Sequence, residues 1–254
     1  MGKIFTIVNQ KGGVGKTTTA VNLSSALHEM GLKTLMCDFD PQANATSGLG
    51  IEKRKIKHSV YDVVVNGVSV EQAILSTKYG DVLPSSADLA GAAVELIAAN
   101  NREKQLKTAL DTVKDRYDAI FIDCPPSLEL LTLNGLCAAD AIIVPVQCEY
   151  YALEGLSDLM RTMRMVKQRL NPRLELFGVI LTMFDGRTNF SNQVAQEVRR
   201  HFPGKVFASV IPRNVRLAEA PSHGIPVHIY DKHSRGSTAY QALAGEFYNK
   251  LKKG

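Results

Sequence analysis

Short, continuously apolar segments alternate along this chain with segments of helical periodicity. The apolar segments span residues 4–9, 34–39, 82–84, 119–124, 141–146, 177–184 and 206–211. A strand in which every residue is apolar is typical of a parallel sheet that is buried on both faces. The alternation therefore predicts an α/β fold with a single doubly wound, mostly parallel sheet and helices on both faces.

Helical periodicity connects these strands in the order that such a sheet requires. The predicted helices cover residues 17–30, 88–99, 102–113, 128–137, 153–170, 189–201 and 237–252. We find no linker rich in proline, glycine or serine, so we expect one domain over residues 1–254. Ligands of doubly wound sheets bind where the strands end, so the chemistry is expected near residues 10, 39, 124, 147, 184 and 212.

Composition excludes two classes of protein. With 45% apolar and 22% charged residues, the chain is an ordinary globular sequence and not a disordered one. It has no apolar run near the roughly 20 residues that span a bilayer, and its first residues lack a signal-peptide pattern, so we expect a cytoplasmic protein. The four cysteines form no C-x-x-C pair, which favours free thiols over the alternative of a metal or iron–sulfur site.

Positive charge is concentrated in the second part of the chain. Residues 1–150 carry 14 Lys/Arg and 17 Asp/Glu, whereas residues 151–254 carry 16 Lys/Arg and 8 Asp/Glu. Such asymmetry suggests a face that meets a polyanion, although a basic half is more often only a solvated surface.

A glycine-rich loop follows the first predicted strand and precedes the first predicted helix. It reads Lys11-Gly12-Gly13-Val14-Gly15-Lys16-Thr17-Thr18. Glycines let backbone N–H groups surround phosphate oxygens, and the helix N-terminus adds partial positive charge. Lys16 is expected to reach the β- and γ-phosphates, and the Thr17 hydroxyl to bind Mg²⁺. A dinucleotide-binding loop is excluded because the pattern counted from Gly13 needs a glycine where Thr18 stands.

The loop departs from the general phosphate-loop pattern at two positions. Gln10 replaces the first glycine, and Lys11 is an additional lysine. This K-G-G-x-G-K-T form resembles the deviant Walker A ATPases, which include ParA/Soj, MinD and the nitrogenase iron protein. The resemblance implies that Lys11 reaches across a nucleotide-sandwich dimer to the phosphates of the other subunit. A second cation there would neutralise charge that develops on the transferred phosphoryl group.

Carboxylates end two of the apolar segments. Asp38 and Asp40 belong to a segment that resembles the family's D-x-D-P-Q switch, and alternation places both on one side of the strand. We expect Asp40 to position the attacking water, the main task in phosphoryl transfer. Asp123 ends an apolar strand that resembles a Walker B motif, and we expect it to bind Mg²⁺ through a water.

Three later segments narrow the resemblance to chromosomal ParA/Soj ATPases. They cover residues 146–155, 181–187 and 211–224. The resemblance implies that Pro212 and Asn214 contact adenine and that an ATP-bound homodimer binds double-stranded DNA without sequence preference. It places Arg187 and Arg216 on the DNA, which makes the protein nucleoid-associated. It also implies a weak ATPase that a ParB-like, centromere-binding partner stimulates.

Two other branches of the family are alternatives. A MinD-like membrane-surface ATPase would attach through its last helix, which here carries an apolar stripe from Ala239 to Leu251. The opposite face of that helix is nearly uncharged, so we expect the stripe to pack on the sheet and expect no stable membrane association. An electron donor like the nitrogenase iron protein is disfavoured by the positions of the cysteines.

Overall fold

The computed structural model describes residues 2–149 and 152–253; Tyr150 and Tyr151, part of one segment compared above, lie outside the described residues. Within those ranges a seven-stranded sheet has the order β3-β4-β2-β5-β1-β6-β7. Every neighbouring pair is parallel except β3 with β4, so the predicted fold class is confirmed. The strands are β1 (Lys3–Ile7), β2 (Thr34–Asp38), β3 (Leu75–Thr77), β4 (Gly80–Leu83), β5 (Ala119–Asp123), β6 (Ala141–Gln147) and β7 (Glu175–Thr182).

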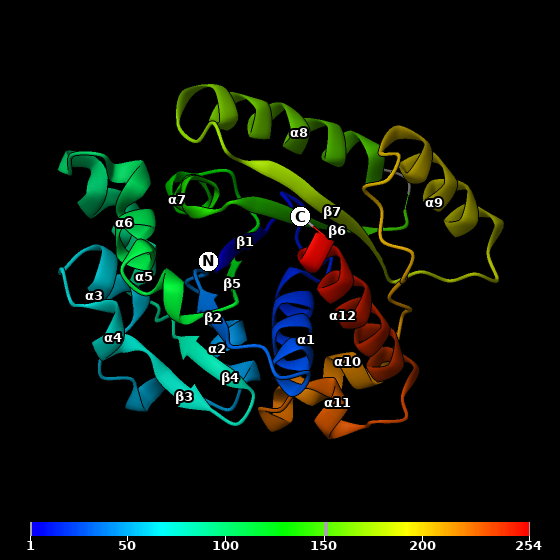
Figure 1. Cartoon of the computed structure of the whole chain (residues 1–254), viewed down its shortest axis with the longest axis horizontal. Coiled ribbons are helices and arrows are strands. Elements are labelled where there is room, and N and C mark those ends of the chain that lie inside the picture. The colour runs from blue at the N-terminus through cyan, green and yellow to red at the C-terminus, as the bar shows by residue number, and fades with distance from the viewer. Residues whose placement is uncertain (1, 150–151, 254) are drawn as a thin grey trace.

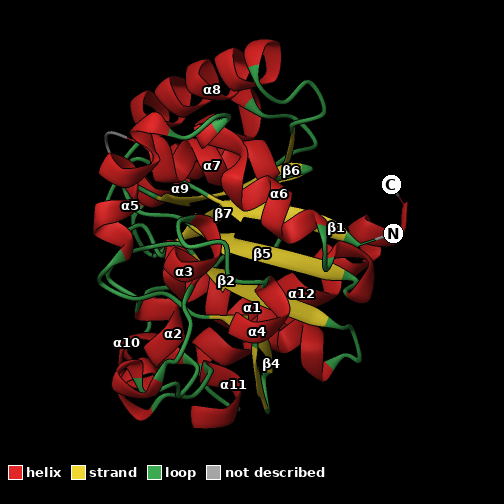
Figure 2. Cartoon of the chain, turned by 90° about the vertical axis from the view of Figure 1, so that its left-hand side faces the viewer, coloured by secondary structure: helices red, strands yellow, loops and turns green. Residues whose placement is uncertain are grey.

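Helices cover both faces of the sheet (Figures 1 and 2). They are α1 (Lys16–Glu29), α2 (Asn44–Gly48), α3 (Val60–Val64), α4 (Val70–Ala73), α5 (Leu89–Glu95), α6 (Gln105–Asp111), α7 (Leu130–Ala138), α8 (Ala152–Arg169), α9 (Asn189–His201), α10 (Val215–Glu219), α11 (Val227–Tyr230) and α12 (Arg235–Lys253).

Alternate residues of each central strand enter different parts of the core. In β1, Phe5 and Ile7 pack with α1 and α12, which lie side by side in Figure 1. Ile4 points to the other face, where α3, α5 and α6 cover β4, β2 and β5. On that same face α8 and α9 cover β6 and β7, with Ile142 and Leu181 in the core. Burial on both faces explains why the strands are continuously apolar.

The strand predicted over residues 206–211 is wrong. Val206 forms an isolated bridge to Val179 of β7, and Pro212 forms one to Phe184 beyond that strand. Between them, Phe207 N and Ile211 N donate to the Val179 and Leu181 carbonyls at 2.9 and 2.8 Å. The Glu246 carboxylate of α12 accepts from the two amides in between, because Ala208 N and Ser209 N donate to Glu246 Oε1 and Oε2 at 2.8 and 2.9 Å. A carboxylate 37 residues away in the chain therefore satisfies the Ser209 amide, and the pairing with β7 is interrupted there.

The two helices predicted between residues 88 and 113 are also partly wrong. The chain instead alternates α5 and α6 with single 3₁₀ turns, and Asn101 takes a left-handed conformation (φ 54°) that interrupts the path. Leu89, Leu96 and Leu106 are nonetheless buried. Periodicity records which side of a segment is buried, and α and 3₁₀ turns can bury the same side.

All four cysteines are buried free thiols, as predicted. Burial raises the pKa of Cys137 and of Cys148 to about 11. In the part of the chain that the structure describes, no helix is long and apolar enough to cross a membrane. Gly2 and Lys252, near the two ends of the described chain, line one cleft together with Lys3, the first residue of β1.

Candidate nucleotide and magnesium site

The glycine-rich loop lies between β1 and α1 with its backbone open to a ligand. Gly13 and Gly15 have φ values of 75° and 89°, which L side chains rarely adopt. A Cβ placed on Gly12 or Gly13 would meet no atom within 4 Å. The space beside these two peptides is therefore free for phosphate oxygens, and α1 begins at Lys16 directly behind it.

Two side chains, one just after β1 and one at the end of β7, hold this loop in place. Asn9 Nδ2 donates to the carbonyl of Pro145 in β6 at 2.8 Å, and its Oδ1 accepts from Lys11 N at 3.0 Å. Thr182 Oγ1, at the end of β7, donates to the Val14 carbonyl at 2.8 Å. The loop is thus anchored to β6 and β7 before a nucleotide arrives. The sequence analysis missed both anchors, because polar residues at strand ends do not reveal which loop they contact.

Lys16 is buried at the centre of the site. Its Nζ donates to the Lys11 carbonyl at 3.1 Å. Burial lowers the pKa of Lys16, and the negative charges of Asp123 and Asp40 partly oppose that shift. One buried lysine thus faces several carboxylates beside the loop.

Sheet register brings Asp38 and Asp123 together. β2 and β5 pair with Asp38 beside Asp123, and both side chains are completely buried. Asp38 Oδ2 accepts from the backbone N and the Oγ1 of Thr46, each at 2.7 Å. Burial nevertheless raises the pKa of Asp38 to about 6. Burial, together with the charge of Asp38, also raises the pKa of Asp123, and the nearby Thr17 hydroxyl and Lys16 ammonium oppose that rise.

Asp123 and Thr17 fit the magnesium ligands predicted from the sequence. Among the described residues, neither carboxylate oxygen of Asp123 has a hydrogen-bond partner, although both are buried. A buried carboxylate without partners is costly unless a cation neutralises it. Asp38, Asp40 and Asp123 together outnumber Lys16, and hard carboxylate and hydroxyl oxygens suit Mg²⁺.

Asp40 lies just beyond the strand, which corrects its predicted position. β2 ends at Asp38, so Asp40 lies in the following turn and not on the same strand face. Its Oδ1 accepts from Gln42 N at 2.9 Å, and its own N–H donates to Asp38 Oδ1 at 3.3 Å. Ala43, three residues after Asp40, has a left-handed conformation with φ 51° and is buried. This turn is therefore built tightly against the carboxylate cluster.

A cleft of about 350 Å³ continues from the loop toward α10. Gly15 and Thr18 line it on one side, and Pro212 and Asn214 line it on the other. Asn214 Oδ1 caps α10 by accepting from Arg216 N at 3.0 Å, which leaves its amide N–H groups for a ligand. The structure thus brings the predicted adenine contacts next to the predicted phosphate contacts.

The Lys11 side chain pairs with a residue outside its own loop. Its ammonium forms an ion pair with Glu149, which follows β6. Both side chains remain partly exposed, at 42% and 33%. The sequence analysis did not identify Glu149, because an acid after a strand has no distinctive spacing relative to the loop.

The two arginines predicted to contact DNA are both exposed, and each is paired with acids of its own chain. Arg187, with a side chain 90% exposed, donates to both oxygens of Asp185 at 2.9 and 2.8 Å. Arg216 pairs with Glu219 at 2.7 Å and with Asp231 at 3.2 Å. Arg187 lines a cleft of about 810 Å³ that Arg216 does not line. Both guanidinium groups are neutralised by acids of their own chain.

Comparison with known proteins agrees with this geometry. A family model described as an AAA domain matches residues 2–176. The sporulation initiation inhibitor protein Soj of Bacillus subtilis is 55% identical over 97% of this chain and 98% of its own length. The chromosome partitioning protein ParA of Myxococcus xanthus is 51% identical over 97% of this chain and 88% of its own length.

A solved structure has the same fold with its ligands bound. It is the cobyrinic acid a,c-diamide synthase from Mycobacterium smegmatis with ADP and magnesium, 38% identical, with a TM-score of 0.87 over 100% of this chain and 97% of that one. The preformed loop, the ordered strand-end carboxylates and the two relatives above half identity agree with one another. This chain belongs to the ParA/Soj family of chromosome-partitioning P-loop ATPases.

Proposed function

We propose that this ATPase is a nucleotide-timed switch that binds DNA as an ATP-bridged homodimer and partitions chromosomes or plasmids. The observation that carries the proposal is the position of Lys11. The loop around Lys16 is already anchored to β6 and β7. Lys11, at the start of that loop, pairs with Glu149 and is partly exposed. A lysine so placed is available to a second subunit.

ATP binding uses the residues of one subunit first. The backbone of Gly12, Gly13, Val14 and Gly15 and the side chains of Lys16, Thr17 and Thr18 hold the phosphates, while Pro212 and Asn214 hold adenine. Mg²⁺, when bound by Thr17 and, through a water, by Asp123, offsets the charge of the phosphates and of the buried carboxylates. Two structures of the cobyrinic acid a,c-diamide synthase from Mycobacterium smegmatis, one with ADP and magnesium and one with an ATP analogue and magnesium, support this arrangement.

Hydrolysis then opens the dimer. Asp40 orients the water that attacks the γ-phosphate, and Lys11 from the other subunit stabilises the charge that develops. Lys11 must leave Glu149 to do so, which gives a slow intrinsic rate. A ParB-like partner raises the rate by favouring the arrangement in which Lys11 faces the phosphates.

DNA binding depends on the closed dimer. Arg187 and Arg216 exchange their internal carboxylates for DNA phosphates when the two subunits align them on one surface. Such contacts carry no sequence information and weaken steeply with salt. The resulting localisation is to the nucleoid.

The alternative of a MinD-like membrane ATPase has less support. The apolar stripe of α12 packs against the sheet and α1, where four of its residues are buried in the core: Tyr240, Leu243, Ala244 and Phe247. No free apolar face remains on that stripe for a membrane, so no stable membrane association is part of the proposal.

One variant separates ATP binding from hydrolysis. We expect Asp40→Ala to bind ATP while its hydrolysis falls on the order of 100-fold, because the water is no longer positioned. Light scattering should then find a lasting ATP dimer that stays on DNA. A variant that hydrolyses ATP at the normal rate would contradict the role of Asp40.

A second variant tests the DNA surface. Arg216→Glu should retain the ATPase activity and the ATP dimer but lose DNA binding in an anisotropy assay. Glu175→Ala, an exposed change at the far end of the sheet, is a folding control. Undiminished DNA binding by Arg216→Glu would remove Arg216 from the proposal.

A further inference from the structure

The turn that carries Asp40 closes on the carboxylate of Asp38. At the start of the turn Asp38 Oδ1 accepts from Asp40 N at 3.3 Å, and at its end Asp38 Oδ2 accepts from Thr46 N and Thr46 Oγ1, each at 2.7 Å. We propose that Thr46 is a positioning residue for ATP hydrolysis: its hydroxyl holds the end of this turn against β2 and thereby fixes Asp40, without taking part in ATP binding. The proposal deepens the proposed function, because it rests on the role given there to Asp40.

The Thr46 hydroxyl has a defined direction. It donates its one proton to Asp38 Oδ2 and accepts from Ser85 N at 3.0 Å, just beyond the end of β4. Since the Ser85 amide can only donate, the hydroxyl proton has to point to Asp38. Thr46, Asp38 and Ser85 are all completely buried. The hydroxyl thus joins α2 to the ends of two paired strands, β2 and β4.

Asp38 also supplies a cap that α2 lacks. The N-cap residue of α2 is Ala43, whose side chain cannot accept a hydrogen bond. The carboxylate of Asp38 accepts in its place from the Thr46 amide, in the first turn of the helix, which otherwise has no intrahelical partner. The contact between Asp38 and Thr46 therefore fixes where α2 begins, directly after the turn.

Within this turn Asp40 has one carboxylate oxygen left for a ligand. Asp40 Oδ1 accepts from Gln42 N at 2.9 Å, and Ala43 N donates to the Asp40 carbonyl at 2.9 Å. In the part of the chain that the structure describes, no hydrogen bond uses Asp40 Oδ2, so this oxygen is available to a water. Its direction depends on the position of the turn, and a misplacement of about 1 Å can slow a reaction on the order of 100-fold.

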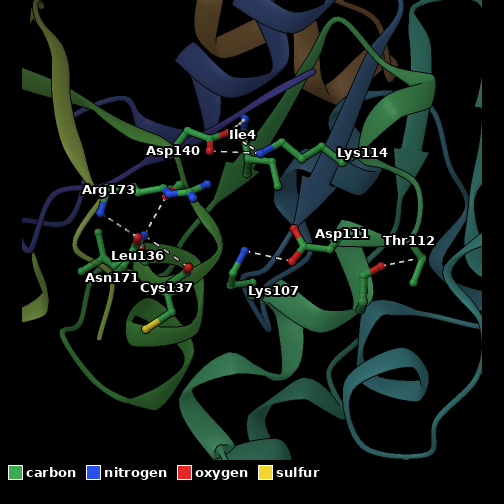
Figure 3. A network of polar contacts seen from close by, with 12 residues as sticks. Ile4, Lys107, Asp111, Thr112, Lys114, Leu136, Cys137, Asp140, Asn171 and Arg173 are labelled. Atoms are coloured by element: carbon green, nitrogen blue, oxygen red, sulfur yellow. Dashed lines mark hydrogen bonds and ion pairs between the residues drawn. The ribbon is translucent and has the colours of Figure 1, made fainter. Parts of the chain in front are cut away.

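A second carboxylate holds backbone at the opposite end of the sheet, and its partners differ. Asp140 Oδ2 accepts from Ile4 N at 2.8 Å, and the two Asp140 oxygens accept from Lys114 Nζ at 3.0 and 2.8 Å (Figure 3). Among the described residues, the donors on Asp38 are two backbone amides and a hydroxyl, none of them charged. A lysine on Asp38 would neutralise a carboxylate of the magnesium site, whereas the Thr46 hydroxyl holds that carboxylate and leaves its charge. This is the kind of donor that can fix a group beside a reaction.

Three variants of Thr46 test the proposal. Thr46→Val and Thr46→Ala remove the hydroxyl, whereas Thr46→Ser keeps it. Alanine is smaller and favours a helix, which covers the case that valine prevents folding. Thr6→Val is the matched control, because Thr6 is also completely buried and its Oγ1 donates to the Gly135 carbonyl at 2.8 Å, away from the turn.

The measurements separate binding from hydrolysis. Circular dichroism first establishes that each variant is folded at the assay temperature. Calorimetry then gives the affinity for a non-hydrolysable ATP analogue with Mg²⁺, and a single-turnover assay gives the rate of ATP hydrolysis. Hydrogen exchange of the amides of residues 40–46 reports on the turn itself, without reference to activity.

We expect Thr46→Val and Thr46→Ala to hydrolyse ATP about 10-fold more slowly, to bind the analogue within about twofold of the unchanged protein, and to exchange faster in residues 40–46. Thr46→Ser and Thr6→Val should hydrolyse ATP at the normal rate. Normal hydrolysis by the hydroxyl-free variants beside slow hydrolysis by Asp40→Ala would overturn the proposal. So would an equal loss of rate in Thr6→Val, or a loss of analogue binding as large as the loss of rate.

Asp40→Ala, measured in the same assays, separates this proposal from the proposed function. Normal hydrolysis by Asp40→Ala would refute the role of Asp40 in orienting water. The exchange data would then still decide whether Thr46 holds the turn: faster exchange in the hydroxyl-free variants would support that role, and unchanged exchange would overturn it.

Discussion

The two ends of the sheet differ in charge and in burial. Where the strands end, Asp38, Asp40 and Asp123 are buried around one lysine, and a preformed loop lies beside them. Where the strands begin, five exposed or half-exposed cations share a cleft without internal partners. The first end can take up a cation and a phosphate chain, whereas the second presents exposed positive charge to the surroundings.

This difference shows that the two ends of one parallel sheet can carry two different electrostatic interactions, one buried and one exposed to solvent. Neutralising buried carboxylates is a short-range task that salt screens little, whereas attraction of a polyanion by exposed cations is screened strongly. Division of the chain into an acidic first part and a basic second part does not describe this, because Lys3 comes from the first part and Asp231 from the second. The relevant axis runs along the strands.

The largest effect is expected from removing the buried cation at the nucleotide end. Lys16→Ala should weaken ATP binding on the order of 100-fold, because it removes a charged contact to the phosphates and leaves three carboxylates facing them. Lys33→Ala, an exposed lysine at the other end, is the matched control and should bind ATP normally. Calorimetric titration checks both, and equal losses would break the distinction between the two ends.

The buried carboxylates at the nucleotide end should make the stability of the protein depend on pH. The pKa of folded Asp38 is raised to about 6, so the folded state retains a proton that the unfolded chain releases near pH 4. The free energy of unfolding of the metal-free protein should therefore contain a term that decreases as pH rises through about 4 to 6, by up to about 3 kcal/mol.

Urea unfolding of the metal-free protein and of Asp38→Asn on both sides of this interval checks the prediction. The stability of the unchanged protein relative to the variant should fall with rising pH, and Mg²⁺ should restore much of it only on the alkaline side. A constant difference between the two proteins would show that Asp38 does not carry the term.

The fold and most of the phosphate site follow from local sequence signals. Apolar runs marked the buried strands, and the glycine pattern placed Lys16 and Thr17 at the start of α1. The sequence could not supply contacts between distant segments. Thr182 on the Val14 carbonyl, Glu149 on Lys11 and Glu246 on the 206–212 segment each depend on how strands and helices are arranged in space. The cationic cleft where the strands begin was missed for the same reason, since its cations come from separate elements.

The segment that the sequence analysis wrongly assigned as a strand connects the two ends of the molecule. Glu246→Ala should destabilise the protein by about 1–3 kcal/mol, because the amides of Ala208 and Ser209 lose a charged acceptor. Glu246→Gln, which keeps one oxygen acceptor, should cost less. Thermal unfolding measures both variants; equal stability of Glu246→Ala and the unchanged protein would show that the 206–212 segment does not depend on this carboxylate.

The smallest effect tests the tight turn beside Asp40. Ala43 has φ 51°, so Ala43→Gly should relieve about 1 kcal/mol of backbone strain, offset in part by the greater freedom of glycine in the unfolded chain. We expect a slightly higher melting temperature. Ala90→Gly, in the first turn of α5, has no positive φ and should lower it. A decrease in both variants would indicate that the turn is not strained.

The central claim is that ATP, bound at one end of the sheet, controls attachment to DNA. Its most direct test is the affinity of the unchanged protein for a random-sequence duplex with ATP, with ADP and without nucleotide, each over a range of salt. The account predicts that only ATP strengthens binding above the nucleotide-free level and that this gain is lost as salt increases. Equal affinity in the ATP and ADP states would contradict it.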